Sequence, residues 1–341
     1  MADQNPTQNL LRIAGLLGLL LVLWGVISFI FGCNFLPIPM NCDVYYGILH
    51  FSENGQPKIL IVYGDEGMGN HELLQRTMEN PSILGLHPRS VHIDTISVGN
   101  LREYDLVIVE QARKISTDKL KMFMEYVNFG GRLVWTGDAG TELSQGDERL
   151  TEFERGNDNN SNNYASGWGR KESGKVVAFD EFLGVDYLGN FCQAKTCLST
   201  PYIGLLEAPE RQNKFVYSIR PGLKMYGDFS LVKLRGDAPS KVLLNVDLGG
   251  GLLANPDFSN SSAAGTQENS GGAIGGIVPA TKRNLGKIFP VVVQNGFGGR
   301  IIYYSIPPDF FVSEGMPVDP ETGQRMRYTS FIENLYYGYF G

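Results

Sequence analysis

The segment Trp135–Gly140, with the sequence WTGDAG, has the residue spacing of a nucleophile elbow. It follows the apolar residues Leu133 and Val134, so the pattern predicts a strand that ends in a tight turn of small residues. In such a turn one side chain stands exposed above the sheet, and in hydrolases and amidotransferases it is a nucleophilic Ser or Cys. Asp138 occupies that position here. The sequence therefore predicts the scaffold of such an enzyme without its nucleophile.

Further acids stand where neighbouring strands are predicted to end. Asp65 and Glu66 follow the first strand, Glu110 ends another, and Glu142 lies one turn beyond Asp138. Since ligands of open α/β sheets bind at the carboxyl ends of strands, we expect these side chains to converge. Converging carboxylates either raise a pKa or hold a hard cation such as Mg²⁺ or Ca²⁺. Alternatively, each acid caps a helix or faces water. We expect no cofactor, with Mg²⁺ or Ca²⁺ as the alternative.

Strand and helix patterns alternate through the first half of the folded region. Short apolar runs predict buried strands at 58–65, 104–110 and 132–136, and alternating residues predict another at 91–98. Helices are expected at 71–79 and after Ser116. We also expect a helix at 176–183, short β segments across 202–248, strands at 289–294 and 300–305, and a helix at 325–339. This order predicts an α/β fold, a parallel sheet with helices on both faces and a β-rich C-terminal part.

The N-terminal region is predicted to anchor the chain in a membrane. Residues 13–31 are apolar and uncharged, close to the ~20 residues that cross a bilayer as a helix. We therefore expect a tail at 1–12, a transmembrane helix at 13–32, a connector at 33–57, and a domain at 58–341 with insertions near 144–174 and 249–287. Arg12 before the span favours a single-pass protein with its bulk outside the cell. A cleaved signal peptide and a lipoprotein acylated at Cys33 are the alternatives.

Composition and cysteines narrow the function classes. The chain has 341 residues, a formal net charge of −7 and 43% hydrophobic residues, which favour a folded core and argue against nucleic acid as a partner. Two cysteine pairs are close in sequence, Cys33 with Cys42 and Cys192 with Cys197, so two local disulfides could form outside the cell. Four unrelated thiols are the alternative.

The order of these segments resembles the class I glutamine amidotransferase-like superfamily, in its non-amidotransferase branches such as ThuA-like and trimerisation-type domains. The resemblance covers most of residues 58–340 as a pattern and implies the fold rather than a function. The segments that carry it are Lys58–Asp65, Tyr104–Glu110, Phe129–Asp138, Phe182–Val185, Pro290–Val293, Gly296–Ser305 and Phe331–Asn334.

The chain departs from the amidotransferase members at each catalytic position. Those members use a Cys at the elbow and a late His-Glu pair, whereas Asp138 stands at this elbow and all four histidines precede it. A Cys or Ser nucleophile needs a base to take its proton, and a classical triad has no candidate here. We expect a binding or assembly module for a protein partner or glycan, or self-association. The alternative is a metal-dependent hydrolase of sugar or envelope material that uses Asp65, Glu110 and Asp138.

Overall fold

The structure is a computed structural model that describes residues 15–20, 57–144, 147, 151–153, 168–172, 175–194, 203–209, 212–248, 287–296, 298–319 and 322–341. The chain divides into two compact units, residues 1–56 with 340–341 and residues 57–339. In the first unit, residues 15–20 are helical and their leucines are exposed. Within the described residues, no helix has the length and apolar character that spanning a membrane requires. Most of the predicted span 13–32 lies outside those residues, as do the tail 1–12 and nearly all of the connector 33–57.

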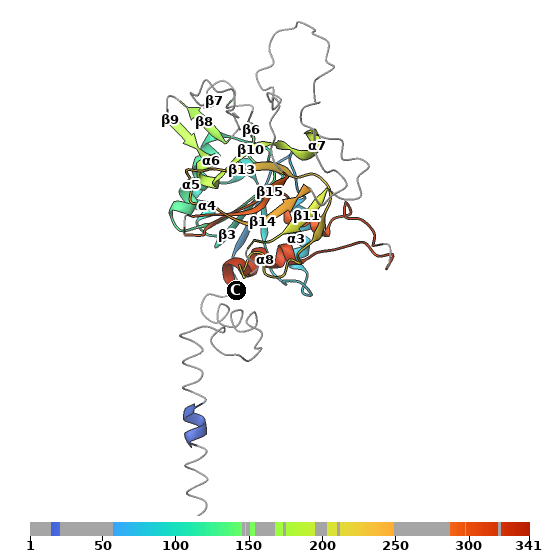
Figure 1. Ribbon diagram of the computed structural model, residues 1–341. Helices are drawn as coiled ribbons and strands as arrows, with labels where there is room; N and C mark the ends of the chain where they lie inside the picture. The colour runs from blue at the N-terminus through green and yellow to red at the C-terminus, as the bar shows by residue number, and fades with distance from the viewer. Residues whose placement is uncertain are drawn as a thin grey trace, which may run out of the picture. The chain divides into compact units, whose positions relative to one another are not determined.

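The second unit is an α/β domain built on one large sheet (Figure 1). Its helical segments are α3 (His71–Glu79), η2 (Ile93–Thr95), α4 (Val98–Leu101), α5 (Thr117–Asn128), α6 (Phe179–Leu183), α7 (Phe191–Ala194), η5 (Pro308–Val312) and α8 (Ser330–Phe340). The strands of the large sheet are β1 (Ile59–Tyr63), β2 (Arg89–His92), β3 (Leu106–Glu110), β5 (Arg132–Thr136), β11 (Gly204–Glu207), β12 (Leu223–Met225), β14 (Lys241–Asp247), β15 (Ile288–Asn295) and β16 (Ile301–Tyr304). Smaller sheets pair β4 (Lys114–Ile115) with β6 (Glu142–Leu143), β10 (Val185–Asn190) with β13 (Ser230–Leu234), and β7 (Thr151–Phe153) and β9 (Lys175–Ala178) with β8 (Gly169–Glu172).

The large sheet is half parallel and half antiparallel. Its order is β12-β11-β14-β15-β16-β5-β3-β1-β2, and the strands from β16 to β2 run parallel. Counted along the chain, these five have the order 2-1-3-4-5 of flavodoxin-like sheets. Strands β15, β14, β11 and β12 continue the sheet antiparallel, which confirms a β-rich C-terminal part. Because β16 runs parallel to β5, η5 begins at the same edge of the sheet as the turn after β5.

Local capping explains the two helices that flank the parallel half. Asn70 accepts a hydrogen bond from Leu73 N–H and caps α3, and Ser116 accepts from Lys119 N–H and caps α5. Both helices begin where the sequence predicted. The chain leaves β1 toward β2 and leaves β3 toward β5, in opposite directions across the sheet. Since such crossovers are right-handed, α3 and α5 cover opposite faces.

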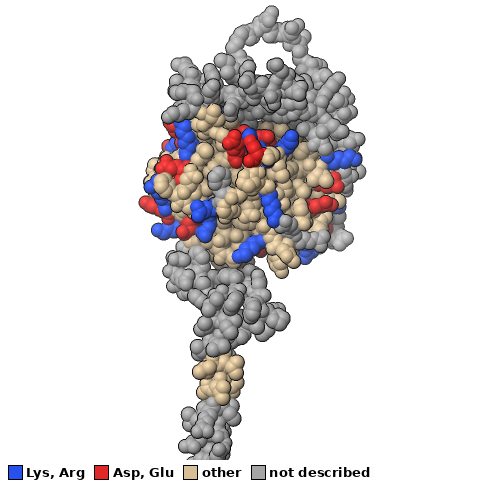
Figure 2. All heavy atoms as spheres, turned by 60° about the vertical axis from the view of Figure 1, so that its left-hand side comes forward, with Lys and Arg blue, Asp and Glu red and all other residues tan. Residues whose placement is uncertain are grey.

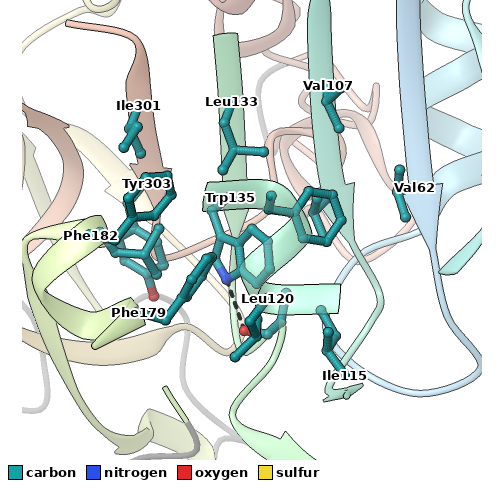
Figure 3. Close-up of a cluster of buried hydrophobic side chains, with 14 of the residues drawn as sticks. Val62, Val107, Ile115, Leu120, Leu133, Trp135, Phe179, Phe182, Ile301 and Tyr303 are labelled. Atoms are coloured by element: carbon teal, nitrogen blue, oxygen red, sulfur yellow. Dashed lines mark hydrogen bonds between the residues drawn. The ribbon is translucent and has the colours of Figure 1, made fainter. Parts of the chain in front are cut away.

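Both faces of the parallel strands are buried. Alternate strand residues meet α5 and α6 in one hydrophobic cluster, while the intervening residues Ile61, Ile108 and Val134 are also fully buried. Figure 3 shows Val62, Val107, Leu133 and Ile301 on successive strands, with Trp135 beneath them and Phe179 and Phe182 packing from α6. The Trp135 indole N–H donates to the carbonyl of Ala139 at 2.8 Å, which ties the turn after β5 to this core.

Three predicted elements are wrong in part. The helix expected at 325–339 begins only at Ser330, and Arg325 instead forms a β-bridge with Val318. The strand expected at 91–98 ends at His92, because the chain then forms η2 and α4. The helix expected at 176–183 begins only at Phe179, because residues 175–178 form β9 and pair with β8. Strands β7 and β8 lie inside the insertion predicted near 144–174, while the insertion near 249–287 lies almost wholly outside the described residues.

Candidate functional site

The turn after β5 has the tight geometry expected of an elbow. Gly137 has φ +54°, and a Cβ atom there would lie 2.9 Å from the Cβ of Met68. A glycine is therefore required both for the left-handed backbone and for the close approach of Met68. The chain continues into β6 rather than into a helix. The backbone supports an elbow-like turn but offers Asp138 no helix N-terminus to cap.

Asp138 is buried, with 1% of its surface exposed, which corrects the expectation that it stands exposed above the sheet. Its Oδ1 accepts a hydrogen bond from the Met68 backbone N–H at 2.8 Å. Its Oδ2 accepts from Arg113 Nε at 2.7 Å and from Asn190 Nδ2 at 3.1 Å. Three donors from three separate segments thus meet one carboxylate, which compensates for its burial and joins those segments.

A shell of neutral polar groups fixes this arrangement. The Asn190 side-chain oxygen accepts from Tyr187 Oη at 2.8 Å and from Ser230 Oγ at 3.1 Å, so its amide nitrogen is directed at Asp138. Burial raises the pKa of Tyr187, which keeps its hydroxyl a donor. Tyr303 Oη donates to the Gly137 carbonyl at 2.9 Å. The buried network is hydrogen-bonded throughout, as a structural carboxylate requires.

Arg113 connects the hydrogen-bond network around Asp138 with the protein surface. Its side chain is 28% exposed, and its Nη groups make no hydrogen bond with the described residues. Burial disfavours its charged form, but the charge and hydrogen bond of Asp138 outweigh that and raise the pKa of Arg113. Glu142 adds to the effect through its charge and is half-buried nearby. A fixed guanidinium with open donors is suited to binding acceptor oxygens.

The two acids after β1 lie apart from this network. The Asp65 side chain is 90% exposed, and His92 Nε2 lies 3.3 Å from its Oδ1. Glu66 forms an ion pair with Lys114 at 3.1 Å, and both side chains are about half exposed. Exposed pairs of this kind contribute little to stability.

Glu110 belongs to a second buried site that the sequence did not predict. It ends β3 in register with Tyr63 of β1 and is completely buried. Burial raises the pKa of Glu110 well above its usual value, and the adjacent carboxyl of Asp309 raises it further through charge and a hydrogen bond. Burial also raises the pKa of Asp309, whose Oδ2 accepts from Asn70 N–H at 2.9 Å. Both shifts favour the protonated, uncharged form of these buried carboxyl groups.

The sequence carried a usable signal for Asp309. It lies just beyond the last parallel strand, β16, at the edge where Glu110 also ends its strand. The rule that singled out acids at the carboxyl ends of strands would have included it if the direction of β16 had been known.

The five predicted acids therefore do not converge on one site. Among the residues that the structure describes, no group of three or more His, Cys, Asp and Glu side chains is placed to hold a metal ion. Asp138 and Glu142 lie near Arg113, Glu110 lies beside Asp309, and Asp65 and Glu66 are exposed to solvent.

The cysteines are only partly visible. Cys192 lies in α7 and its thiol is not free. Its expected partner Cys197 lies outside the described residues, as do Cys33 and Cys42. Both pairings stay predictions.

Comparison with known proteins finds solved structures that are similar to this chain only to a limited extent. No family model matches the chain, and no curated protein matches it. A ThuA-like protein from Bacteroides uniformis is 12% identical, with 83% of this chain and 92% of that chain covered and a TM-score of 0.47. A β-galactosidase from Rahnella sp. R3 is 12% identical over 83% of this chain and only 30% of its own, with a TM-score of 0.44. The N-terminal domain of mmIFT52 is 11% identical over 73% of this chain and 86% of its own, with a TM-score of 0.38. Because every TM-score is below 0.5, these likenesses assign neither family nor function.

Proposed function

We propose that this chain is a membrane-anchored, extracytoplasmic binding or assembly module for a protein partner or a glycan, with an amidotransferase-like domain that carries no catalytic triad. The observation that carries the proposal is the burial and hydrogen bonding of Asp138. A catalytic group must reach its substrate, but this carboxylate is buried and accepts three hydrogen bonds within the fold. The elbow position therefore serves the structure.

We place the proposed contact with the partner where the hydrogen-bond network around Asp138 reaches the protein surface, at Arg113 and Glu142. Arg113 is held by Asp138 and keeps its Nη donors open, and the half-buried carboxylate of Glu142 offers acceptors beside it. Donors and acceptors side by side suit the hydroxyl groups of a glycan or the polar backbone of a peptide. Basic and acidic side chains are interspersed on the face in Figure 2, which supports such partners over nucleic acid. The predicted helix 13–32 would hold the module at the membrane.

Site-specific photo-crosslinking in the native membrane tests this proposal. A photoreactive amino acid at Glu142 of the full chain is expected to give a discrete crosslinked product, and one at the exposed Tyr217 is not. Arg113→Lys keeps the charge but loses the planar fork, so it should weaken the product strongly. The matched control Arg89→Lys changes an exposed arginine at the start of β2 and should leave it unchanged.

Two outcomes would contradict the proposal. Equal crosslinking at Glu142 and Tyr217 would remove the contact point. Hydrolysis of a glycan or peptide by the purified full chain, lost in Asp138→Asn, would show that Asp138 acts on a substrate and that the chain is an enzyme.

A further inference from the structure

Two turns that are distant in the sequence meet at the amino edge of the sheet, the edge at which the parallel strands β1, β3, β5 and β16 begin. The turn 128–131 connects α5 with β5. The loop 212–222 leads from β11 into β12, and β11 ends at this edge because it runs antiparallel to β16. Tyr339 joins the two turns, since its ring packs against Phe215 of the loop and its hydroxyl donates to the carbonyl of Leu133 at 3.1 Å.

Each turn exposes one aromatic side chain. Phe129 is 63% exposed and Tyr217 is 76% exposed, and among the described residues no other Phe, Tyr or Trp side chain is exposed. The conformation of the Phe129 turn is fixed, because Gly130 has φ +102° and the N–H groups of residues 129–131 all donate to carbonyls of the last turn of α5. The fold therefore holds this aromatic ring in water.

Two arginines flank Phe129. The guanidinium of Arg102 lies 3.6 Å from the centroid of the Phe129 ring and pairs with Glu125 at 3.0 Å. Arg300 adjoins the same turn, since a Cβ on Gly130 would lie 3.7 Å from its Nη1. The Arg300 guanidinium makes no hydrogen bond or ion pair with the part of the chain that the structure describes, and it borders an open hollow of about 330 Å³. An arginine in this position is suited to binding a phosphate group.

The loop 212–222 combines the same two kinds of side chain. Lys214 and Arg220 are exposed on either side of Tyr217, and no residue of the loop is acidic. Exposed acids such as Glu207 lie elsewhere on this edge, so the positive charge is concentrated at the two aromatic turns. Aromatic rings with basic neighbours are typical of surfaces at a membrane interface, where the rings lie at the level of the headgroups.

We propose that the amino edge of the sheet is a membrane-contact surface, on which Phe129 and Tyr217 enter the headgroup region of a phospholipid bilayer and Arg300 binds a lipid phosphate. The proposal rests on the membrane anchorage in the proposed function. Lys58 directly precedes β1, so the chain enters the domain at this same edge. With a span at 13–32, residues 33–56 can extend over no more than about 85 Å, which keeps this edge near the bilayer.

The tether makes a weak contact sufficient. A short linker gives an effective concentration in the millimolar range, so a surface with only millimolar affinity for a bilayer is occupied much of the time. Each basic side chain close to an anionic bilayer strengthens the contact about fivefold. Contact at the amino edge also leaves the proposed partner site directed away from the membrane, because Arg113 and Glu142 follow β3 and β5 at the opposite edge.

Photo-crosslinking to lipid tests this surface. The purified full chain, with benzoylphenylalanine in place of Phe129 or Tyr217, is reconstituted into vesicles of equal parts phosphatidylethanolamine and phosphatidylglycerol and irradiated, and mass spectrometry measures the peptides that carry one lipid. Ile288 is the matched control position, because it is 57% exposed but lies at the opposite edge, where the antiparallel strand β15 begins. The lipid adducts at Phe129 and Tyr217 should exceed the adduct at Ile288 by at least about fivefold.

Two variants test the phosphate contact. Arg300→Gln should lower the lipid adduct at Phe129 by up to about fivefold, because one cation is lost from the surface. Lys114→Gln removes an exposed cation from the opposite edge and should leave the adduct unchanged. Equal yields in Arg300→Gln and wild type would contradict the binding of a phosphate by Arg300.

The test distinguishes this surface from the proposed function. Equal lipid adducts at Phe129, Tyr217 and Ile288 in an anchored chain would overturn the membrane-contact surface alone. Release of the full chain from the vesicles by alkaline carbonate would contradict the anchorage, and the contact would fall with it. The vesicles contain no partner, so the crosslink at Glu142 succeeds or fails independently. In the native membrane, a lipid adduct at Tyr217 differs in mass from the partner product sought at Glu142.

Discussion

Replacing Asp138 by Asn distinguishes two possible roles of this side chain, that of a buried, hydrogen-bonded carboxylate and that of a helix cap. Asn caps a helix about as well as Asp, so a capping role predicts almost no effect. In the observed network, however, one oxygen becomes an NH₂ group that faces donors, either Met68 N–H or the side chains of Arg113 and Asn190. Breaking a buried ion pair from one side costs about 3–5 kcal/mol. Since Arg113 is 28% exposed and can turn to water, we expect a loss of about 2–4 kcal/mol.

Thermal unfolding of the full chain measures this loss. For a domain somewhat larger than 250 residues, about 2–4 kcal/mol corresponds to a fall in Tm of roughly 3–7 °C. Asp65→Asn is the matched control, because the same change is made at a side chain that is 90% exposed. Its effect should stay within about 0.5 kcal/mol. Adding Mg²⁺ or Ca²⁺ should not shift Tm in wild type or in either variant.

Two results would refute this reasoning. A fall in Tm for Asp138→Asn no larger than for Asp65→Asn would mean that the hydrogen bonds to Asp138 are not important for stability. A cation-induced rise in wild type that disappears in Asp138→Asn would mean that the acids do converge on a metal.

Three further predictions concern the buried acids, the cysteines and the topology. The unfolding free energy of wild type should fall as pH rises above about 4.5, by up to about 1.4 kcal/mol per pH unit for each proton, because buried Glu110 and Asp309 have raised pKa values and keep protons that the unfolded chain has lost. In denaturant titrations, Glu110→Gln should have a smaller slope than wild type, and equal slopes would contradict the prediction. Mass spectrometry of unreduced peptides should find Cys192 bonded to Cys197, and two alkylatable thiols in protein from its native compartment would exclude that bond. Protease added to intact cells should trim residues 34–341 from a small anchored stub, whereas full protection until lysis would reverse the orientation.

Local signals in the sequence were sufficient where the chain decides its structure locally. Asn70 and Ser116 begin helices at the predicted residues because their side chains cap the first turn whatever lies around them. The strand Arg132–Thr136 is likewise found as predicted, since a continuous apolar run suits a strand buried on both faces.

Other features depend on contacts between segments that are distant in the sequence, which local sequence patterns do not contain. Residues 176–178 were predicted to be helical, but pairing with β8 makes them part of a strand. Asp138 was identified by spacing alone, but its partners Met68 and Asn190 come from distant segments. Asp309 escaped notice because the direction of the last strand follows from its place in the sheet, which no local pattern contains.

The reactivity of Asp138 tests the central claim most directly. The native full chain would be treated with a carbodiimide and a small amine, and the labelled carboxyls would be located by mass spectrometry. The buried, hydrogen-bonded state of Asp138 predicts that Asp65 and Glu66 are labelled while Asp138 is labelled only after unfolding. Labelling of native Asp138 as fast as Asp65 would mean that it stands exposed at the elbow, and would contradict the account of this chain as a binding module with a structural acid in the catalytic position.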